Sequence, residues 1–263
     1  MRVLVIGDIV GKPGVDAVTA LLPELIASEQ LDLVIANAEN ASGGAGISLK
    51  AYRKLRNAGV DVLTMGDHIY KKADIYRLIA DNQPIVKPAN YPVEAPGAEY
   101  LVVPARDGTP VGVFSLLGRL YMRPVDCPFK AADRVLEALK DQTRCVIVDL
   151  HAEATGDKAV IGRYLDGKVS AVIGTHTHVP TADECILPGG TAFLTDVGMT
   201  GPYESILGRR IDRVLQANRT FVPAPFDVAE GDPRLAAALI DVDNSTGKAR
   251  SIHRIMRRLK QAI

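Results

Sequence analysis

Several features that mark particular classes of protein are missing from this chain of 263 residues. Its formal net charge is zero, whereas proteins that bind long nucleic acid usually carry a basic excess. No apolar run approaches the roughly 18 residues that a membrane-spanning helix needs. The chain also has no low-complexity segment, no internal repeat and no evident linker. We therefore expect one domain over residues 1–263, with neither a membrane nor long nucleic acid as a partner.

Cysteine is scarce as well. The three cysteines are odd in number, lie far apart in the sequence and form no C-x-x-C pair. We expect buried thiols in a reduced, cytoplasmic protein, rather than a disulfide or a cysteine metal site. The opening MRVLVIGD has one arginine and a short apolar run that ends in aspartate, which predicts a first strand and not a signal peptide.

Apolar residues, by contrast, make up 47% of the chain, which is enough for a sizeable core. Five apolar, β-branched runs predict strands buried on both faces, as in a sheet covered by helices. These runs span residues 3–7, 31–37, 60–66, 144–150 and 169–174. Amphipathic patterns predict helices over residues 14–29, 48–59, 72–81 and 129–140. Ser48 is expected to cap the second helix, and Pro23 to kink or reset the first.

Two further segments have the pattern of β-hairpins. They span residues 98–118, with Asp107-Gly108 at the turn, and residues 235–255. The β-α-β opening predicts parallel strands, whereas hairpins require antiparallel pairs. We therefore predict an α/β fold in which two mixed sheets pack face to face, with helices outside.

Polar residues follow each of the five apolar runs. In chain order they are Asp8, Glu39, Asn40, Asp67, His68, His151, His176 and His178. Ligands of open α/β sheets gather beyond the carboxyl ends of the strands. Five neighbouring strands would therefore bring three carboxylates, one amide and four imidazoles to one place.

Each of these residues has an ordinary structural explanation when it is taken alone. Asp8 could cap the following helix, and a single histidine after a strand is usually hydrogen-bonded within the protein. Chance would scatter the histidines, yet four of the five fall in this set, and only His253 lies elsewhere. Massed carboxylates also repel one another, and a cation relieves that repulsion. The set therefore predicts a metal site.

The number and kind of donor atoms bear on the metal. Seven or eight nitrogen and oxygen ligands exceed the needs of one ion. Two ions about 3.5–4 Å apart are the usual device for hydrolysing phosphate esters. Imidazole with carboxylate and no thiolate suits manganese, iron, zinc or cobalt, and it argues against magnesium or calcium as the sole occupant.

The stretch VIGDIVGKPG raises a different possibility, a P-loop of the form G-x-x-x-x-G-K-[ST]. Three residues rather than four separate Gly7 from Gly11, and Pro13 stands where the hydroxyl residue belongs. Proline offers neither a hydroxyl for Mg²⁺ nor a backbone N–H for phosphate. A nucleotide switch is therefore disfavoured, although GTP binding without a transition metal would revive it.

These motifs resemble the calcineurin-like metallophosphoesterase pattern D-(x)n-GD/GNH-(x)n-H-(x)n-GHxH. The chain is similar to the bacterial YmdB-like branch from GDIVGKPG through NAEN, GDHIY and LHAE to GTHTH and TDVGM, nearly its whole length. The resemblance implies a four-layer α/β/β/α sandwich and phosphodiesterase activity. For this branch the implied substrates are 2′,3′-cyclic nucleotides.

The resemblance also implies a role for each residue of the set. A first metal would be held by Asp8, Glu39, Asn40 and His178. Glu39 would bridge to a second metal, completed by Asp67, His151 and His176. A metal-bridging hydroxide would attack phosphorus, and His68 would protonate the leaving oxygen. We expect two divalent or mixed-valence ions, iron or manganese before zinc or cobalt.

The chain departs from the broader family pattern at three positions. Val10 stands where the D-x-H start has its histidine, so Asn40 is expected to substitute for it. The bridging aspartate is Glu39, and the asparagine of GNH is Asp67, which adds negative charge to the second site. This last change leaves the metal preference open.

A small phosphodiester is thus the expected substrate, and a homo-oligomer is compatible with that function. The alternative is a metal-dependent regulatory or scaffold protein with weak phosphoesterase activity, because it would need the same ligands.

Overall fold

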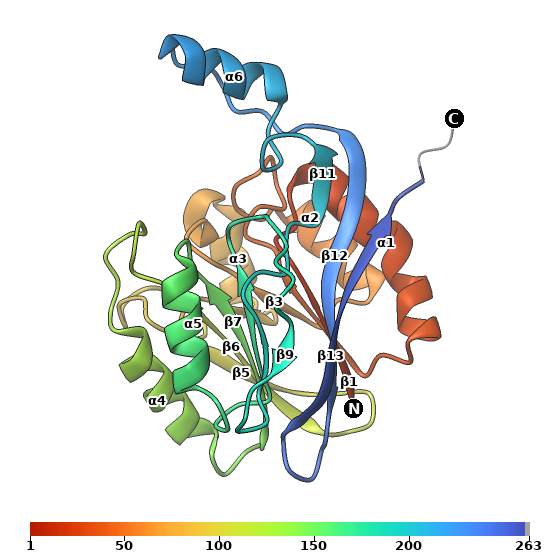
Figure 1. The fold of residues 1–263 in the computed structure, drawn as a ribbon, viewed down its shortest axis with the longest axis vertical. Helices are drawn as coiled ribbons and strands as arrows, with labels where there is room; N and C mark the ends of the chain where they lie inside the picture. The colour runs from red at the N-terminus through yellow and green to blue at the C-terminus, as the bar shows by residue number, and fades with distance from the viewer. Residues whose placement is uncertain (261–263) are drawn as a thin grey trace.

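The computed structural model describes residues 1–260. Within this range six α-helices and thirteen β-strands follow one another along the chain (Figure 1). The helices are α1 (Gly11–Ser28), α2 (Leu49–Ala58), α3 (Asp74–Ala80), α4 (Pro128–Leu139), α5 (Thr155–Tyr164) and α6 (Ile211–Thr220). The strands are β1 (Arg2–Ile6), β2 (Leu33–Asn37), β3 (Val62–Thr64), β4 (Ile85–Val86), β5 (Tyr100–Pro104), β6 (Pro110–Leu117), β7 (Cys145–His151), β8 (Ala171–Thr175), β9 (Cys185–Ile186), β10 (Ala192–Leu194), β11 (Gly201–Glu204), β12 (Gly231–Val242) and β13 (Ala249–Arg258).

The strands form two mixed sheets. The first has the order β11-β12-β1-β2-β3-β4, and β13 pairs with β12. In it β1 to β4 run parallel, whereas β12 is antiparallel to β1. The second has the order β5-β6-β7-β8-β10-β9, with a parallel centre from β6 to β10 and antiparallel edges. Both predicted hairpins are confirmed, as β5–β6 and β12–β13.

Three apolar layers hold the sheets and helices together. Side chains of β1 alternate, so that Val3 and Val5 join the layer between the sheets while Leu4 and Ile6 join the layer under α1, α2 and α3. A third layer lies between the second sheet and the helices α4 and α5. The layers therefore stack as helix, sheet, sheet and helix, which confirms the predicted α/β/β/α sandwich. Helix α6 buries no residue and projects at the top of Figure 1.

Local chemistry accounts for the helix ends. Ser48 Oγ accepts a hydrogen bond from Ala51 N at the start of α2, and Gly59 ends the helix with φ +107°. The first helix differs from the prediction, because it begins at Gly11 and runs through Pro23 to Ser28 as one element. The expected reset at Pro23 does not occur.

The fold brings the polar strand ends together, but the five strands that carry them are not all neighbours in one sheet, as the expectation of five neighbouring strands required. Strands β1, β2 and β3 belong to the first sheet, whereas β7 and β8 belong to the second. Their carboxyl ends meet across the space between the sheets, where Asn37 Nδ2 donates to Asp149 Oδ2 at 2.9 Å. The site therefore lies between two sheets rather than above five adjacent strands.

The cysteines differ from the expectation. Only Cys145 is buried, whereas Cys127 is half-buried and Cys185 is exposed, so the expectation of three buried thiols is wrong. None of the helices in residues 1–260 combines the length and the apolar character needed to cross a membrane.

Candidate metal centre

Four of the predicted ligands form a compact cluster. Donor atoms of Glu39, Asp67, His151 and His176 all lie within 4.8 Å of one another. His151 Nε2 is at its centre, 3.3 Å from Glu39 Oε1, 3.3 Å from Asp67 Oδ1 and 3.0 Å from His176 Nδ1. Two carboxylates and two imidazoles of this kind are a suitable donor set for a transition metal.

Asp8, Asn40 and His178 adjoin this cluster on one side. Asn40 Nδ2 lies 3.1 Å from Glu39 Oε1 and 3.3 Å from His178 Nε2. Asp8 Oδ1 lies 3.8 Å from His151 Nδ1 and 4.0 Å from His178 Nε2. The fold thus brings all seven predicted ligands together, and His68 contacts the same group. His253, the histidine left out of the set, is exposed on β13.

Asp8 gives a direct indication that a cation belongs here. Its side chain is fully buried, and its Oδ1 has no hydrogen-bond partner within residues 1–260. Burial raises the pKa of Asp8 to about 6, although the imidazoles of His178 and His151 oppose the shift. An ionised, buried carboxylate oxygen without a partner is unfavourable unless a cation meets it. The residues present therefore fit a metal ion.

The histidines in the cluster have strongly altered acidity. Burial opposes a charge on His151, yet Glu39, Asp67 and Asp8 together hold its pKa well above the usual value. Burial and the neighbouring His151 lower the pKa of His176 to about 4. Without a metal, a proton on His151 supplies positive charge between the carboxylates, so metal and protons compete for this place.

The backbone at Gly66 allows the cluster to close. A Cβ atom at this position would lie 2.3 Å from Glu39 Oε2 and 2.4 Å from His151 Nε2, too close for any side chain. Glycine after β3 is therefore needed for the carboxylate of the first sheet to reach the imidazole of the second.

Comparison with known proteins agrees with this architecture. A family model described as "YmdB-like protein" matches residues 4–255. The chain belongs to this family. The resemblance inferred from the motifs is thereby confirmed over nearly the whole length.

Relatives of this YmdB-like chain share its full extent. A 2′,3′-cyclic-nucleotide 2′-phosphodiesterase of Bacillus subtilis is 44% identical over 256 residues, which is 97% of each protein. A hypothetical protein from Thermus thermophilus, known from a crystal structure, is 41% identical in sequence. Its structure matches with a TM-score of 0.92 over 98% of this chain and 99% of the Thermus chain. The crystal structure of a novel phosphatase from Mycoplasma pneumoniae is 32% identical, with a TM-score of 0.91 over 98% and 93%. The fold is thus that of the metallophosphoesterase type.

Sequence reasoning missed a buried relay behind His151. Thr175 Oγ1 donates to Asp149 Oδ1 at 2.6 Å and lies 2.9 Å from His151 Nδ1. Because the threonine hydrogen is used on Asp149, His151 donates from Nδ1, which leaves Nε2 as the nitrogen for which a metal and a proton compete. A signal was available, since Asp149 is the one carboxylate within the buried strand CVIVDLH.

A second missed group supports the loop that carries His176 and His178. Lys158 and Asp196 form a fully buried ion pair, with Nζ 2.6 Å from Oδ2. The same carboxylate accepts from Thr177 Oγ1 at 2.8 Å, between the two histidines. Both histidines have positive φ, 92° and 66°, a conformation that needs such support.

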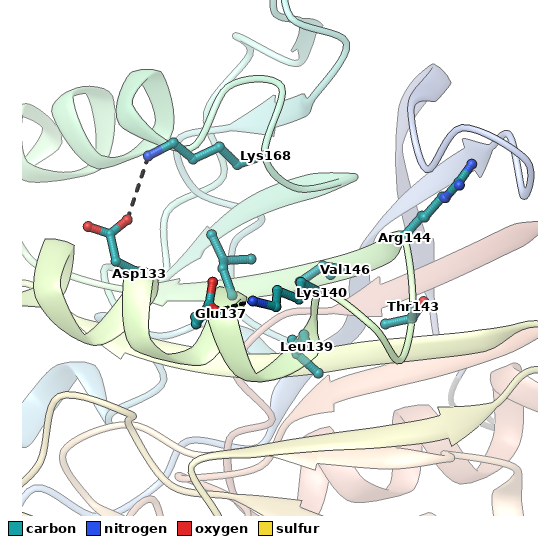
Figure 2. A pocket seen from close by; sticks show the side chains of 9 residues that line it. Asp133, Glu137, Leu139, Lys140, Thr143, Arg144, Val146 and Lys168 are labelled. Carbon is teal, nitrogen blue, oxygen red and sulfur yellow. Dashed lines mark hydrogen bonds and ion pairs between the residues drawn. The ribbon is translucent and has the colours of Figure 1, made fainter.

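A further hollow lies at the opposite end of the second sheet (Figure 2). It is lined by the end of α4 and the start of β7, including Arg144 and Val146, whereas His151 is at the other end of β7. Its location separates this hollow from the metal cluster. Two of its lysines are paired with carboxylates of α4, Lys168 with Asp133 at 3.6 Å and Lys140 with Glu137, whereas Arg144 Nη1 donates to the carbonyl of Ser245.

Proposed function

We propose that this YmdB-like chain is a metal-dependent phosphodiesterase that acts on small phosphodiesters, with 2′,3′-cyclic nucleotides as substrates. The observation that carries the proposal is the cluster in which donor atoms of Glu39, Asp67, His151 and His176 lie within 4.8 Å of one another. The name of the Bacillus subtilis relative supports the substrate class.

We assign the seven ligands to two ions. One ion would be held by Asp8, Glu39, Asn40 and His178, and the other by Glu39, Asp67, His151 and His176. Glu39 is suited to be shared, because its Oε1 lies 3.3 Å from His151 Nε2 and Asn40 is the next residue in the chain. Asn40 would bind through Oδ1, since its amide nitrogen only donates. When bound, such ions supply an activated water and neutralise charge on the phosphoryl oxygens. Iron or manganese, then zinc or cobalt, fit this donor set.

His68 would act as the general acid. Its Nδ1 lies 2.7 Å from Asn40 Oδ1, an oxygen that only accepts, so Nδ1 carries a hydrogen. Asn40 is itself oriented by its contact with Glu39. The remaining nitrogen of His68, Nε2, is then the one that delivers a proton to the departing oxygen. A hydrogen bond with Glu39 raises the pKa of His68, which favours the protonated form.

The test combines elemental analysis with hydrolysis of 2′,3′-cyclic AMP and bis(p-nitrophenyl) phosphate by purified protein. We expect the purified protein to contain a transition metal and to hydrolyse these compounds until a chelator removes the metal. The His176→Ala variant should lose both the bound metal and the turnover. His253→Ala is the matched control, because it removes an exposed histidine from β13 and should change neither. Metal-replete protein that hydrolyses neither compound would refute the proposal.

Turnover also separates this function from the alternative, a regulatory or scaffold protein. Values below roughly 10⁻² s⁻¹ on every phosphoester would favour the alternative, since they lie far under those of typical enzymes. A cytoplasmic location and a homo-oligomer stay predictions of the sequence.

A further inference from the structure

A cavity of about 420 Å³ lies between the starts of α1 and α2. Four lysines line it, and the chain offers one carboxylate among them, that of Asp16. The lysines are Lys12, Lys50, Lys54 and Lys72. In a chain of zero net charge this is a local excess of positive charge, which favours an anion.

Ion pairing leaves part of that charge free. Asp16 is shared by Lys12 Nζ at 2.6 Å and Lys54 Nζ at 3.3 Å. Within residues 1–260, neither Lys50 nor Lys72 has a carboxylate oxygen within ion-pair distance of its Nζ. The lysines of the hollow in Figure 2 differ, because Lys168 and Lys140 each pair with a carboxylate of α4.

The lysine cavity adjoins the metal cluster through short connections. Its wall begins at Ala41, directly after Asn40, and Lys72 follows His68 by four residues. The loop between them is closely packed, since a Cβ on Gly46 would lie 2.7 Å from Lys72 Cγ. Gly11 N donates to Asn40 O at 2.9 Å, which fixes the start of α1 against the same loop. Within the described part of the chain, the cavity and the cluster share no lining residue, and these short segments of chain connect them.

The lysines, rather than the N-terminal end of α2, supply the positive charge that would attract an anion. Two of the first three backbone N–H groups of α2 are already used, because Leu49 N donates to Asp74 Oδ2 at 2.8 Å and Ala51 N donates to Ser48 Oγ at 3.3 Å. The loop in front of the helix is also held in place, by Arg209 Nη2 on Gly44 O at 2.6 Å.

We propose that this lysine cavity binds a second phosphate of the substrate. The inference rests on the proposed function and narrows its substrate class. The preferred substrates are then 2′,3′-cyclic nucleotides that carry a further phosphate at the 5′ position, including short oligonucleotides with a cyclic phosphate end. Lys50 and Lys72 are the groups that recognise the second phosphate.

The experiment compares kcat/KM for adenosine 2′,3′-cyclic phosphate with and without a 5′-phosphate. We expect the 5′-phosphorylated compound to be favoured by about tenfold at low salt, and less as ionic strength screens exposed charges. The double variant Lys50→Gln/Lys72→Gln should lose this preference and keep kcat/KM for the simpler compound within about twofold. Lys71→Gln, an exposed lysine outside the cavity, is the matched control and should keep the preference.

The outcomes separate the two proposals. Equal kcat/KM for both compounds, or a preference that survives in the double variant, overturns the second-phosphate site and leaves the phosphodiesterase standing. Hydrolysis of neither compound by the metal-replete protein overturns both.

Discussion

Replacing Asp8 with asparagine should change stability in opposite directions with and without metal. In the metal-free protein, Asp8 is a fully buried carboxylate with an unpartnered Oδ1. Asparagine has nearly the same shape, and its oxygen can still accept from His176 N, which lies 3.0 Å from Asp8 Oδ2. The substitution therefore removes a charge and creates no cavity.

The magnitude follows from the pKa of Asp8, which burial raises from 3.8 to about 6. A shift of this size corresponds to about 3 kcal/mol of unfolding free energy. Because the folded pKa is above the unfolded one, the folded protein binds more protons between about pH 4 and pH 6, and its stability falls as pH rises through that window. Above pH 6 the full destabilisation is present, and below pH 4 it is absent.

Urea unfolding of chelator-treated protein measures this effect. At pH 7.5 the Asp8→Asn variant should be more stable than the wild type by up to about 3 kcal/mol, and the difference should shrink toward pH 4.5. With a transition metal at about 1,000 times its Kd, the order should reverse, because the wild type gains about 4.1 kcal/mol that the variant cannot, more than the advantage of about 3 kcal/mol that the variant has without metal.

Asp16→Asn is the control for this experiment, since Asp16 is a partly exposed carboxylate paired with Lys12 and Lys54. Losing those pairs should lower stability slightly, by up to about 1 kcal/mol. Metal-free Asp8→Asn that is no more stable than the wild type at pH 7.5, or whose advantage does not depend on pH, would refute the reasoning.

Three other substitutions test other parts of the site. His68→Ala should lower turnover by about 10²–10⁴ with metal content unchanged, and loss of metal in elemental analysis would make His68 a ligand instead. Gly66→Ala should weaken metal binding in equilibrium dialysis, because its Cβ would meet the cluster, whereas Gly156→Ala on α5 has nothing within 4 Å and should not. Lys158→Met should lower the free energy of unfolding, measured by urea titration, by about 3–5 kcal/mol, because it leaves the buried carboxylate of Asp196 without its partner. The control is Lys168→Met, which removes an exposed lysine and should lower the same free energy by less than about 1 kcal/mol.

Much of the candidate site was predictable because strand ends leave a local mark in the sequence. An apolar run followed closely by Asp8, or by Glu39 and Asn40, indicates both that a strand is present and where the strand ends. The cap of α2 was similarly local, since Ser48 and Gly59 act within a few residues of themselves. Features of this kind need no knowledge of distant contacts.

Other elements gave little local indication. Helix α6 buries no residue and was not predicted, although Ile211, Val214 and Leu215 recur at helical spacing in its ten residues. The strands β4 and β9 have two residues each, too few to show a period. Lys158 gave no local indication of its role, because its partner Asp196 lies 38 residues away in sequence.

The sequence by itself determined which side chains could form the site, because their types and their places after apolar runs are local properties. Only the tertiary structure decided how the five strands divide between the two predicted sheets, and hence that His151 faces Glu39 across the space between them. It also decided which oxygen is left unpartnered at Asp8 and which lysines gather beside Asn40. Both features depend on how segments far apart in the chain pack together. They follow from long-range burial and hydrogen bonding, which a short stretch of sequence does not determine.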